Sequence, residues 1–120
     1  MQELKINYRF TTLNEYIKAE RTPKFGYIMA NRIKKRETDV VCLLAKTKLK
    51  KIDKPVDIEF TWLEKTARRD VDNIAFCQKF LLDGLVKAGI LENDSQKFVK
   101  SLYHQFEKDD DYGVIIKLIY

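Results

Sequence analysis

The chain has 120 residues, which gives room for one domain with a single hydrophobic core. Hydrophobic residues make up 45% and charged residues 34% of it, a balance that is typical of a globular protein and excludes a disordered one. No apolar run approaches the roughly 20 residues of a membrane span, and no signal-peptide pattern opens the chain. We therefore expect a soluble, cytoplasmic protein with no membrane partner.

The net charge of +5 is unevenly distributed along the chain. Lysine and arginine crowd residues 18–54, whereas acidic residues gather in 70–94 and 107–111. A nuclease needs both, because cations hold phosphates and carboxylates hold a metal. The same lysines are also compatible with the solvated face of a helix, so charge alone leaves both interpretations open.

Cysteine and histidine are too few for a structural zinc site, since the chain has only Cys42, Cys77 and His104. We expect both cysteines to be buried thiols rather than a disulfide. A metal bound here would take hard oxygen ligands, which Mg²⁺ and Mn²⁺ prefer.

The first half of the chain predicts a strand, a loop and a long helix. Apolar and polar residues alternate over 3–10, which is the period of a half-buried strand. After a loop, the segment Gly26–Lys50 is rich in helix formers and has no further glycine or proline. Residues 40–44 are also compatible with a short strand.

The second half predicts three strands and one helix. Pro55 closes the preceding region, and alternation over 58–62 indicates a strand. Apolar residues at helical spacing then predict a helix over 72–87, with Gly89 at its end. Residues 98–106 and 114–120 indicate two final strands, which we expect to form a hairpin through the acidic turn 107–113.

This order of elements predicts an α/β (α+β) fold. We expect a small single domain over residues 1–120, with a mixed β-sheet flanked by two main helices.

Asp70 and Asp72 are the strongest candidates for metal ligands. They lie two residues apart where an extended chain turns into the predicted helix, and in an extended stretch such a pair projects to one side. The repulsion between two carboxylates aimed at one point is removed by a cation. The alternative is that they only cap the helix, with Asp72 or Asn73 as its N-cap.

Asp94 is the preferred third ligand, with Glu92 and Asn93 in the same loop as other candidates. For Asp94 to reach the first pair, the strand over 98–106 must lie beside the strand that leads to Asp70. A rival site is the acidic turn Glu107–Asp111, whose carboxylates are more simply explained as solvated.

Lys79 follows Asp72 by seven residues and precedes Asp83 by four, so the three side chains share one face of a continuous helix. A lysine on that face could neutralise charge on a metal-bound phosphate in the transition state. An ordinary Lys79–Asp83 surface pair is the alternative. We expect His104, alone in an alternating strand, to be structural rather than catalytic.

Residues 68–96 resemble the RusA family of Holliday-junction resolvases, crossover junction endodeoxyribonucleases that are common in phages and prophages. The family pattern appears here as Arg68-Arg69-Asp70-Val71-Asp72-Asn73, Lys79, Asp83-Gly84-Leu85, Gly89 and Asn93-Asp94. A weaker similarity upstream covers Leu13-Asn14-Glu15-Tyr16 and Arg21.

The resemblance implies a Mg²⁺-dependent endonuclease, with Mn²⁺ able to substitute, that resolves four-way DNA junctions in recombination and repair as a homodimer. It implies that Asp70, Asp72 and Asp94 bind the metal and that Lys79 is catalytic. By their positions in the family pattern, Asn73 and Asp83 would support the site. The residues that would contact DNA are Asn14, Arg21, Arg68 and Arg69.

Two positions depart from the family pattern. The lysine usually comes four residues after the second aspartate, where this chain has Phe76, although the spacing of four from Lys79 to Asp83 is kept. Three extra residues add about one helical turn, which would explain the shift. Asn93 replaces a usual aspartate, which leaves Asp94 as the ligand of that pair. Two alternatives remain, a related nuclease for flaps or duplex DNA and a non-catalytic DNA-binding protein.

Overall fold

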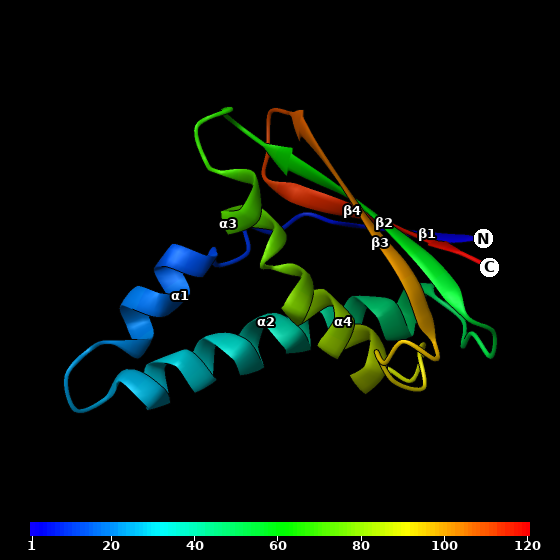
Figure 1. Cartoon of the computed structure of the whole chain (residues 1–120), viewed down its shortest axis with the longest axis horizontal. Coiled ribbons are helices and arrows are strands. Elements are labelled where there is room, and N and C mark those ends of the chain that lie inside the picture. The colour runs from blue at the N-terminus through cyan, green and yellow to red at the C-terminus, as the bar shows by residue number, and fades with distance from the viewer.

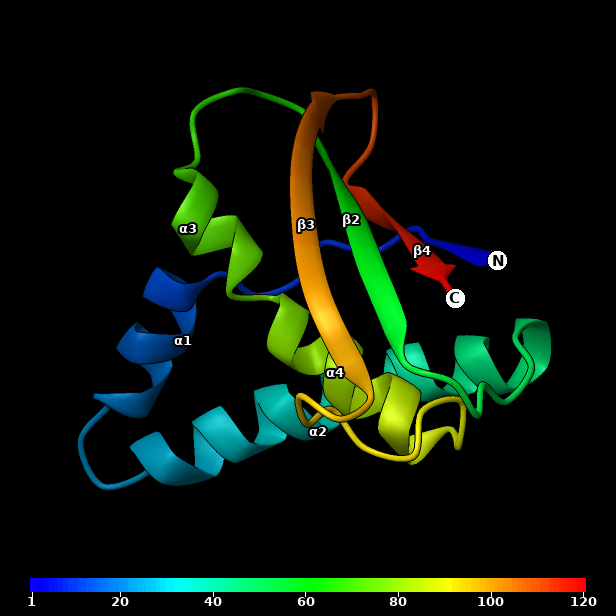
Figure 2. The same cartoon turned by 45° about the vertical axis from the view of Figure 1, so that its right-hand side comes forward.

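In the computed structural model, which describes residues 1–120, helices cover one face of a four-stranded mixed sheet (Figures 1 and 2). The elements are β1 (Gln2–Ile6), α1 (Leu13–Glu20), α2 (Gly26–Lys48), β2 (Val56–Glu64), α3 (Val71–Ala75), α4 (Gln78–Lys87), β3 (Val99–Lys108) and β4 (Gly113–Ile119). The predicted α+β class with a mixed sheet is therefore confirmed, and no helix is long and apolar enough to span a bilayer.

The sheet has the strand order β1-β4-β2-β3. β4 lies in the middle and pairs antiparallel with both β1 and β2, whereas β2 and β3 pair in parallel. The expected terminal hairpin is wrong, because β2 lies between β3 and β4. The chain crosses the end of β2 instead, where the backbone N–H of Asp109 donates to the Glu64 carbonyl at 2.8 Å.

The core lies between the sheet and the helices. Alternate side chains of β2 (Ile58, Phe60 and Trp62) are buried against α2 and α4, as the alternation over 58–62 predicts. The opposite face of the sheet has no helix over it, as Figures 1 and 2 show. Leu81 and Leu85 of α4 and Val41 of α2 pack in the same cluster, which joins both helices to the sheet.

The first half of the chain differs from the prediction at β1 and at the loop after it. β1 ends at Ile6 rather than residue 10, and the following segment is tied to α2 because the carboxylate of Glu37 accepts from the Thr11 N–H at 2.6 Å. The expected loop contains α1, whose start is a capping box between Thr12 and Glu15. α2 is one helix through residue 48, so the alternative strand over 40–44 is wrong.

The predicted helix over 72–87 is divided into α3 and α4 at Phe76 and Cys77. Hydrogen bonds of the tighter i to i+3 type cross this junction, from Cys77 N–H to Ile74 O and from Lys79 N–H to Phe76 O. α4 ends at Lys87 as predicted, and Gly89, the residue after its C-cap, has a φ of +77°. Both hydrogen bonds of a Schellman motif are formed there, from Gly89 to Val86 and from Ile90 to Leu85.

Candidate functional site

Asp70 and Asp72 lie just beyond the carboxyl end of β2, at the entry to α3. Asp70 is the N-cap of α3, with an extended backbone at φ −69° and ψ 144°, and its carbonyl accepts from the Ile74 N–H at 3.1 Å. Asp72 already lies in the first turn. The prediction that the pair straddles a transition from extended chain to helix is confirmed, but the expectation that Asp72 or Asn73 is the N-cap is wrong.

Both carboxylates are exposed and keep oxygen atoms free of protein partners. The side chain of Asp70 makes no capping hydrogen bond. Asp72 accepts one hydrogen bond through Oδ1, from the Asn73 N–H at 2.9 Å, which leaves its second oxygen available. Two adjacent carboxylates of this kind offer the hard donors that Mg²⁺ takes in proteins, together with open positions for water and phosphate.

An ion pair between Arg69 and Glu64 anchors the loop that carries Asp70. The guanidinium donates from Nε and Nη2 to the two carboxylate oxygens at 2.7 and 2.6 Å, and only 18% of the Arg69 and 9% of the Glu64 side chain is exposed. Arg69 also lies 5.1 Å from the ring centroid of Tyr112. The hydrogen bonds that Arg69 donates to Glu64 raise the pKa of Arg69 above its ordinary value, so the guanidinium stays charged.

The two neighbouring arginines that were expected to contact DNA have different environments. Arg69 is engaged within the fold, whereas Arg68 is exposed beside Asp70 and forms no ion pair. The resemblance did not single out Glu64 or Tyr112. The available signal for Glu64 was a carboxylate at the end of a strand, five residues before an arginine.

Asn73 and Asn14 are brought into contact. The Asn14 backbone N–H donates to Oδ1 of Asn73 at 2.8 Å, which links the first turn of α1 to α3. Asn73 therefore ties the residue after Asp72 to α1. Arg21, the C-cap of α1, is exposed at the end of that helix opposite to the Asn14 contact.

Asp94 lies at the opposite end of the sheet from Asp70 and Asp72. The strand that follows Asp94 does lie beside β2, as its candidacy required, but the two strands are parallel. In parallel strands Val56 is paired with Val99 and Glu64 with Lys108, so the loop before β3 meets the beginning of β2 rather than its end. Figure 2 shows the loop before β3 and the loop between β2 and α3 at opposite ends of β3.

A single chain therefore does not bring the three aspartates together. No group of three or more His, Cys, Asp or Glu side chains is placed to hold a metal ion, and this also applies to the rival acidic turn Glu107–Asp111. Glu92 and Asn93 share the loop of Asp94 and are exposed at the same end of the sheet.

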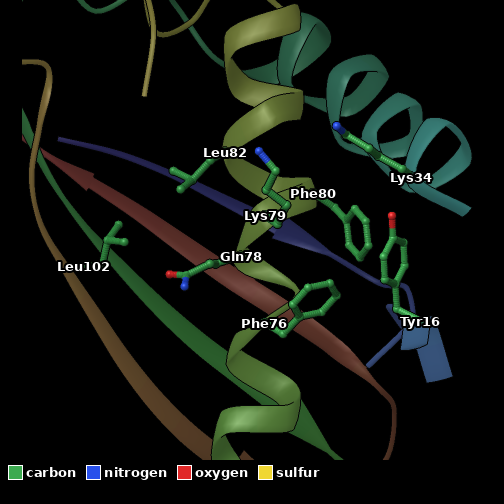
Figure 3. Close-up of a pocket in the computed structure, with 8 residues that line it drawn as sticks. All are labelled: Tyr16, Lys34, Phe76, Gln78, Lys79, Phe80, Leu82 and Leu102. Atoms are coloured by element: carbon green, nitrogen blue, oxygen red, sulfur yellow. The ribbon is translucent and has the colours of Figure 1, made fainter. Parts of the chain in front are cut away.

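Lys79 lines a cleft of about 450 Å³ on the outer side of α4. Figure 3 shows Lys34 reaching this cleft from α2 and Lys79 from α4, with the rings of Tyr16, Phe76 and Phe80 close together. Lys79 Nζ lies 3.2 Å from Asp83 Oδ1, so the surface pair that was the alternative to a catalytic Lys79 is present. Neither Asp70 nor Asp72 lines this cleft. The prediction that Asp72 and Lys79 share one face of a continuous helix is wrong, because the helix is broken between them.

His104 uses both ring nitrogens within the fold. Trp62 Nε1–H donates to Nδ1 at 3.0 Å, which requires the proton of the neutral ring to lie on Nε2, 3.1 Å from Gln78 Oε1. The ring also stacks on Phe60 at 5.0 Å. Burial lowers the pKa of His104, and these contacts agree with the structural role expected for it.

The cysteines are both buried and unpaired, as predicted. Burial raises the pKa of the Cys77 thiol to about 12, and its Sγ lies 3.2 Å from the Thr11 carbonyl. A thiol that remains protonated at neutral pH is neither a nucleophile nor a metal ligand, so Cys77 contributes packing rather than chemistry.

Comparison with models of known protein families finds no match to this chain, and comparison with curated proteins finds none either. The assignment of a function therefore rests on the residues themselves.

Proposed function

We propose that the protein is a Mg²⁺-dependent, structure-selective endodeoxyribonuclease of the Holliday-junction resolvase type. The observation that carries this proposal is the pair of exposed carboxylates at the entry to α3, Asp70 at the end of a braced loop and Asp72 in the first helical turn. Exposed Arg68 beside the pair supplies a cation for a phosphate. The motif in which these residues occur is the part of the chain that resembles the RusA family.

In this proposal Asp70 and Asp72 hold Mg²⁺, or Mn²⁺ in its place, through carboxylate oxygens. The metal supplies Lewis acidity and an activated water for hydrolysis of a phosphodiester bond. Arg68 orients a DNA phosphate. The family resemblance alone assigns Lys79 the role of offsetting charge that develops on the phosphate, because Lys79 is paired with Asp83 and lines a cleft that contains neither Asp70 nor Asp72.

The brace on this loop has a role in the proposed chemistry. A metal ligand must be held close to its productive position, and loops alone hold side chains less firmly than packed elements do. The Arg69–Glu64 pair fixes the residue immediately before Asp70, and the Asn14–Asn73 hydrogen bond fixes the residue immediately after Asp72.

Cleavage and binding assays with Asp72→Asn test this function. We expect the variant to bind a four-way junction as the parent does in the absence of metal, and to lose junction cleavage by more than the roughly 10–100-fold that loss of an outer-shell metal partner costs. Asp53→Asn, which makes the same change at an exposed aspartate elsewhere, should cleave normally. Normal cleavage by Asp72→Asn would remove the metal assignment.

A panel of substrates decides the substrate class. Cleavage of a four-way junction in preference to flap and linear duplex DNA supports the resolvase type, and equal cleavage of all three supports a more general nuclease. A non-catalytic DNA-binding protein predicts binding without cleavage in Mg²⁺ or Mn²⁺, and no change in the melting temperature when either ion is added.

A further inference from the structure

The cleft that Lys79 lines has a wall of three aromatic rings, from Tyr16 of α1, Phe76 at the junction of α3 and α4, and Phe80 of α4. The ring centroids of Tyr16 and Phe76 lie 5.5 Å apart, and those of Phe76 and Phe80 lie 5.7 Å apart. Phe80 is buried, whereas Tyr16 and Phe76 are half-buried and keep part of their rings open to solvent. We call this the aromatic cleft. Its open ring surface can stack on a planar ligand, and its volume of about 450 Å³ suits a small one.

The charged residues that line the aromatic cleft are both cationic. They are Lys34 of α2 and Lys79 of α4, and no carboxylate lines the cleft. Lys79 is paired with Asp83, whereas Lys34 is exposed and forms no ion pair. Figure 3 shows both ammonium groups toward the same end of the cleft. A ligand with a planar ring and a negative charge fits this lining, with the ring against the aromatic side chains and the anion at Lys34.

Lys34 also lines a second cleft, which lies between α2 and α4 and which we call the lysine cleft. It has a volume of about 300 Å³ and no apolar lining, and its cations are Lys34, Lys35 and Lys87. Its carboxylates, Asp39 and Asp83, are each paired with a lysine of α4, which leaves Lys34 and Lys35 as cations without an ion pair. An aromatic surface followed by a row of cations is the lining that a single nucleic-acid strand requires, because its bases stack and its phosphates follow one another.

The aromatic cleft begins one helical turn after the carboxylate pair. Phe76 follows Asp72 by four residues, and its N–H donates to the Asp72 carbonyl at 3.2 Å, so the two side chains lie on one face of α3. Four residues rise about 6 Å along a helix, which is about the length of two stacked nucleotides of one DNA strand. A strand that passes the aspartates therefore reaches the cleft within a few nucleotides. The family pattern has a lysine at the position of Phe76, so this wall is a feature of the present chain.

We propose that the aromatic cleft binds one unpaired nucleotide of a DNA strand whose backbone continues into the lysine cleft. The base stacks on Tyr16 and Phe76, and the phosphate lies at Lys34. This inference rests on the proposed function, because it takes branched DNA as the substrate. A base that is stacked in a duplex cannot present its face to a side chain, so the cleft selects nucleotides that have left the base stack, as they do more readily at a branch point than in linear duplex.

The first experiment measures binding of a labelled oligothymidylate by fluorescence anisotropy, without divalent metal. Phe76→Leu and Tyr16→Leu each keep an apolar side chain but remove a ring, and each should weaken this binding about 5–150-fold, the range for loss of one base–aromatic stack. Binding of a duplex of the same length should not change. Phe25→Leu makes the same substitution at an exposed phenylalanine outside both clefts and should bind as the parent does. Parental binding by both cleft variants, with thermal unfolding showing that they are folded, overturns the proposal.

The second experiment tests the phosphate contact through the dependence of binding on salt concentration. For Lys34→Met we expect the slope of log K against log salt to become shallower by about 0.7, the contribution of one phosphate contact on a single strand. Lys46→Met removes the same charge from the same helix outside both clefts and should keep the parental slope. A parental slope in Lys34→Met contradicts the contact. Displacement of the oligothymidylate by an equal concentration of thymidine monophosphate would assign the cleft to a free nucleotide and overturn the proposal.

A junction with unpaired thymidines at its crossover connects the cleft to the proposed substrate. We expect the parent to bind it more tightly than the fully paired junction, and Phe76→Leu to lose this difference; a parent without the difference overturns the selection of unpaired nucleotides. The two proposals fail separately. A parent that binds the oligothymidylate through Phe76 and Lys34 but cleaves no DNA keeps the cleft and overturns the proposed function. A parent that cleaves junctions, with parental binding by Phe76→Leu, keeps the proposed function and overturns the cleft.

Discussion

The backbone N–H of Asn14 donates a 2.8 Å hydrogen bond to Oδ1 of Asn73, so a side chain of α3 caps the first turn of α1. Replacing Asn73 with alanine leaves that N–H without its acceptor. We expect the free energy of unfolding to fall by about 1 kcal/mol, the usual cost of losing a helix cap, as measured by urea denaturation.

Asn73→Asp is the matched control, because it keeps an acceptor oxygen and places a negative charge at the amino end of α1. It should retain the stability that the alanine variant loses. Equal losses in the two variants would show that the Asn14 contact is not what Asn73 contributes.

The Glu64–Arg69 pair predicts a larger effect. Glu64→Gln removes the charge that faces a guanidinium with only 18% of its side chain exposed, and breaking such a pair from one side leaves the other charge poorly solvated. We expect a loss of about 2–4 kcal/mol in the free energy of unfolding. Arg68→Ala, at the exposed neighbouring position, should leave stability unchanged and weaken DNA binding, with a shallower dependence of binding on salt concentration.

His104 predicts a specific dependence of stability on pH. Its pKa in the folded chain lies below the ordinary value of 6.5, so folding disfavours its protonation. The stabilisation is complete above pH 6.5 and is lost as the pH falls through the lower pKa of the folded protein. Because His104 is the only histidine, His104→Gln should flatten the part of the stability profile that lies below pH 6.5 and above the range in which carboxylates titrate. An unchanged profile in that variant would assign the pH dependence to other groups.

Gly84 marks the closest approach of α4 to α2. A Cβ atom at this position would lie 2.4 Å from Cβ of Val41. We expect Gly84→Ala to lower the free energy of unfolding by about 1–3 kcal/mol, because overpacking exceeds the gain in helix propensity. Gly89→Asn, at a position with a φ of +77° and no nearby atoms, should be nearly neutral in the same thermal or urea measurement.

Lys79 is predicted to affect the rate of cleavage rather than DNA affinity. If Lys79 has the role proposed for it, its charge acts on the transition state, and Lys79→Met should lower kcat on a four-way junction about 100-fold with an almost unchanged Kd. Lys34→Met removes a cation from the same cleft and should change Kd without a comparable change in kcat. A Lys79→Met variant with normal kcat would limit Lys79 to its pair with Asp83.

The elements with strong periodicity were predictable from the sequence. Alternation over 58–62 identified the core face of β2, and the helical spacing after residue 72 identified the segment that crosses from β2 to β3. The break at Phe76 and Cys77 was not predictable, because both residues are compatible with a continuous helix and the tighter turn is set by packing. α1 was predicted to be a loop, although Thr12 followed by Glu15 is the sequence pattern of a capping box at the start of a helix.

The candidate site was predictable only where its residues are close in sequence. Asp70, Asp72 and Asn73 depend on a local transition from strand to helix, which the sequence shows directly. The position of Asp94 depends on strand direction, and adjacency alone does not specify it. A parallel partner places the preceding loop at the far end of β2, whereas an antiparallel partner would have placed it near Asp70.

The position of β4 determines when the sheet can be completed during synthesis. β1 pairs with no strand except β4, and Gln2 lies opposite Leu118. β1 therefore has no strand partner until β4 has been synthesised. At about 5–20 residues per second this interval lasts several seconds, during which β1 remains available for other contacts. Because the loop between the two strands is long, the pairing of β1 with β4 is the step that completes the sheet.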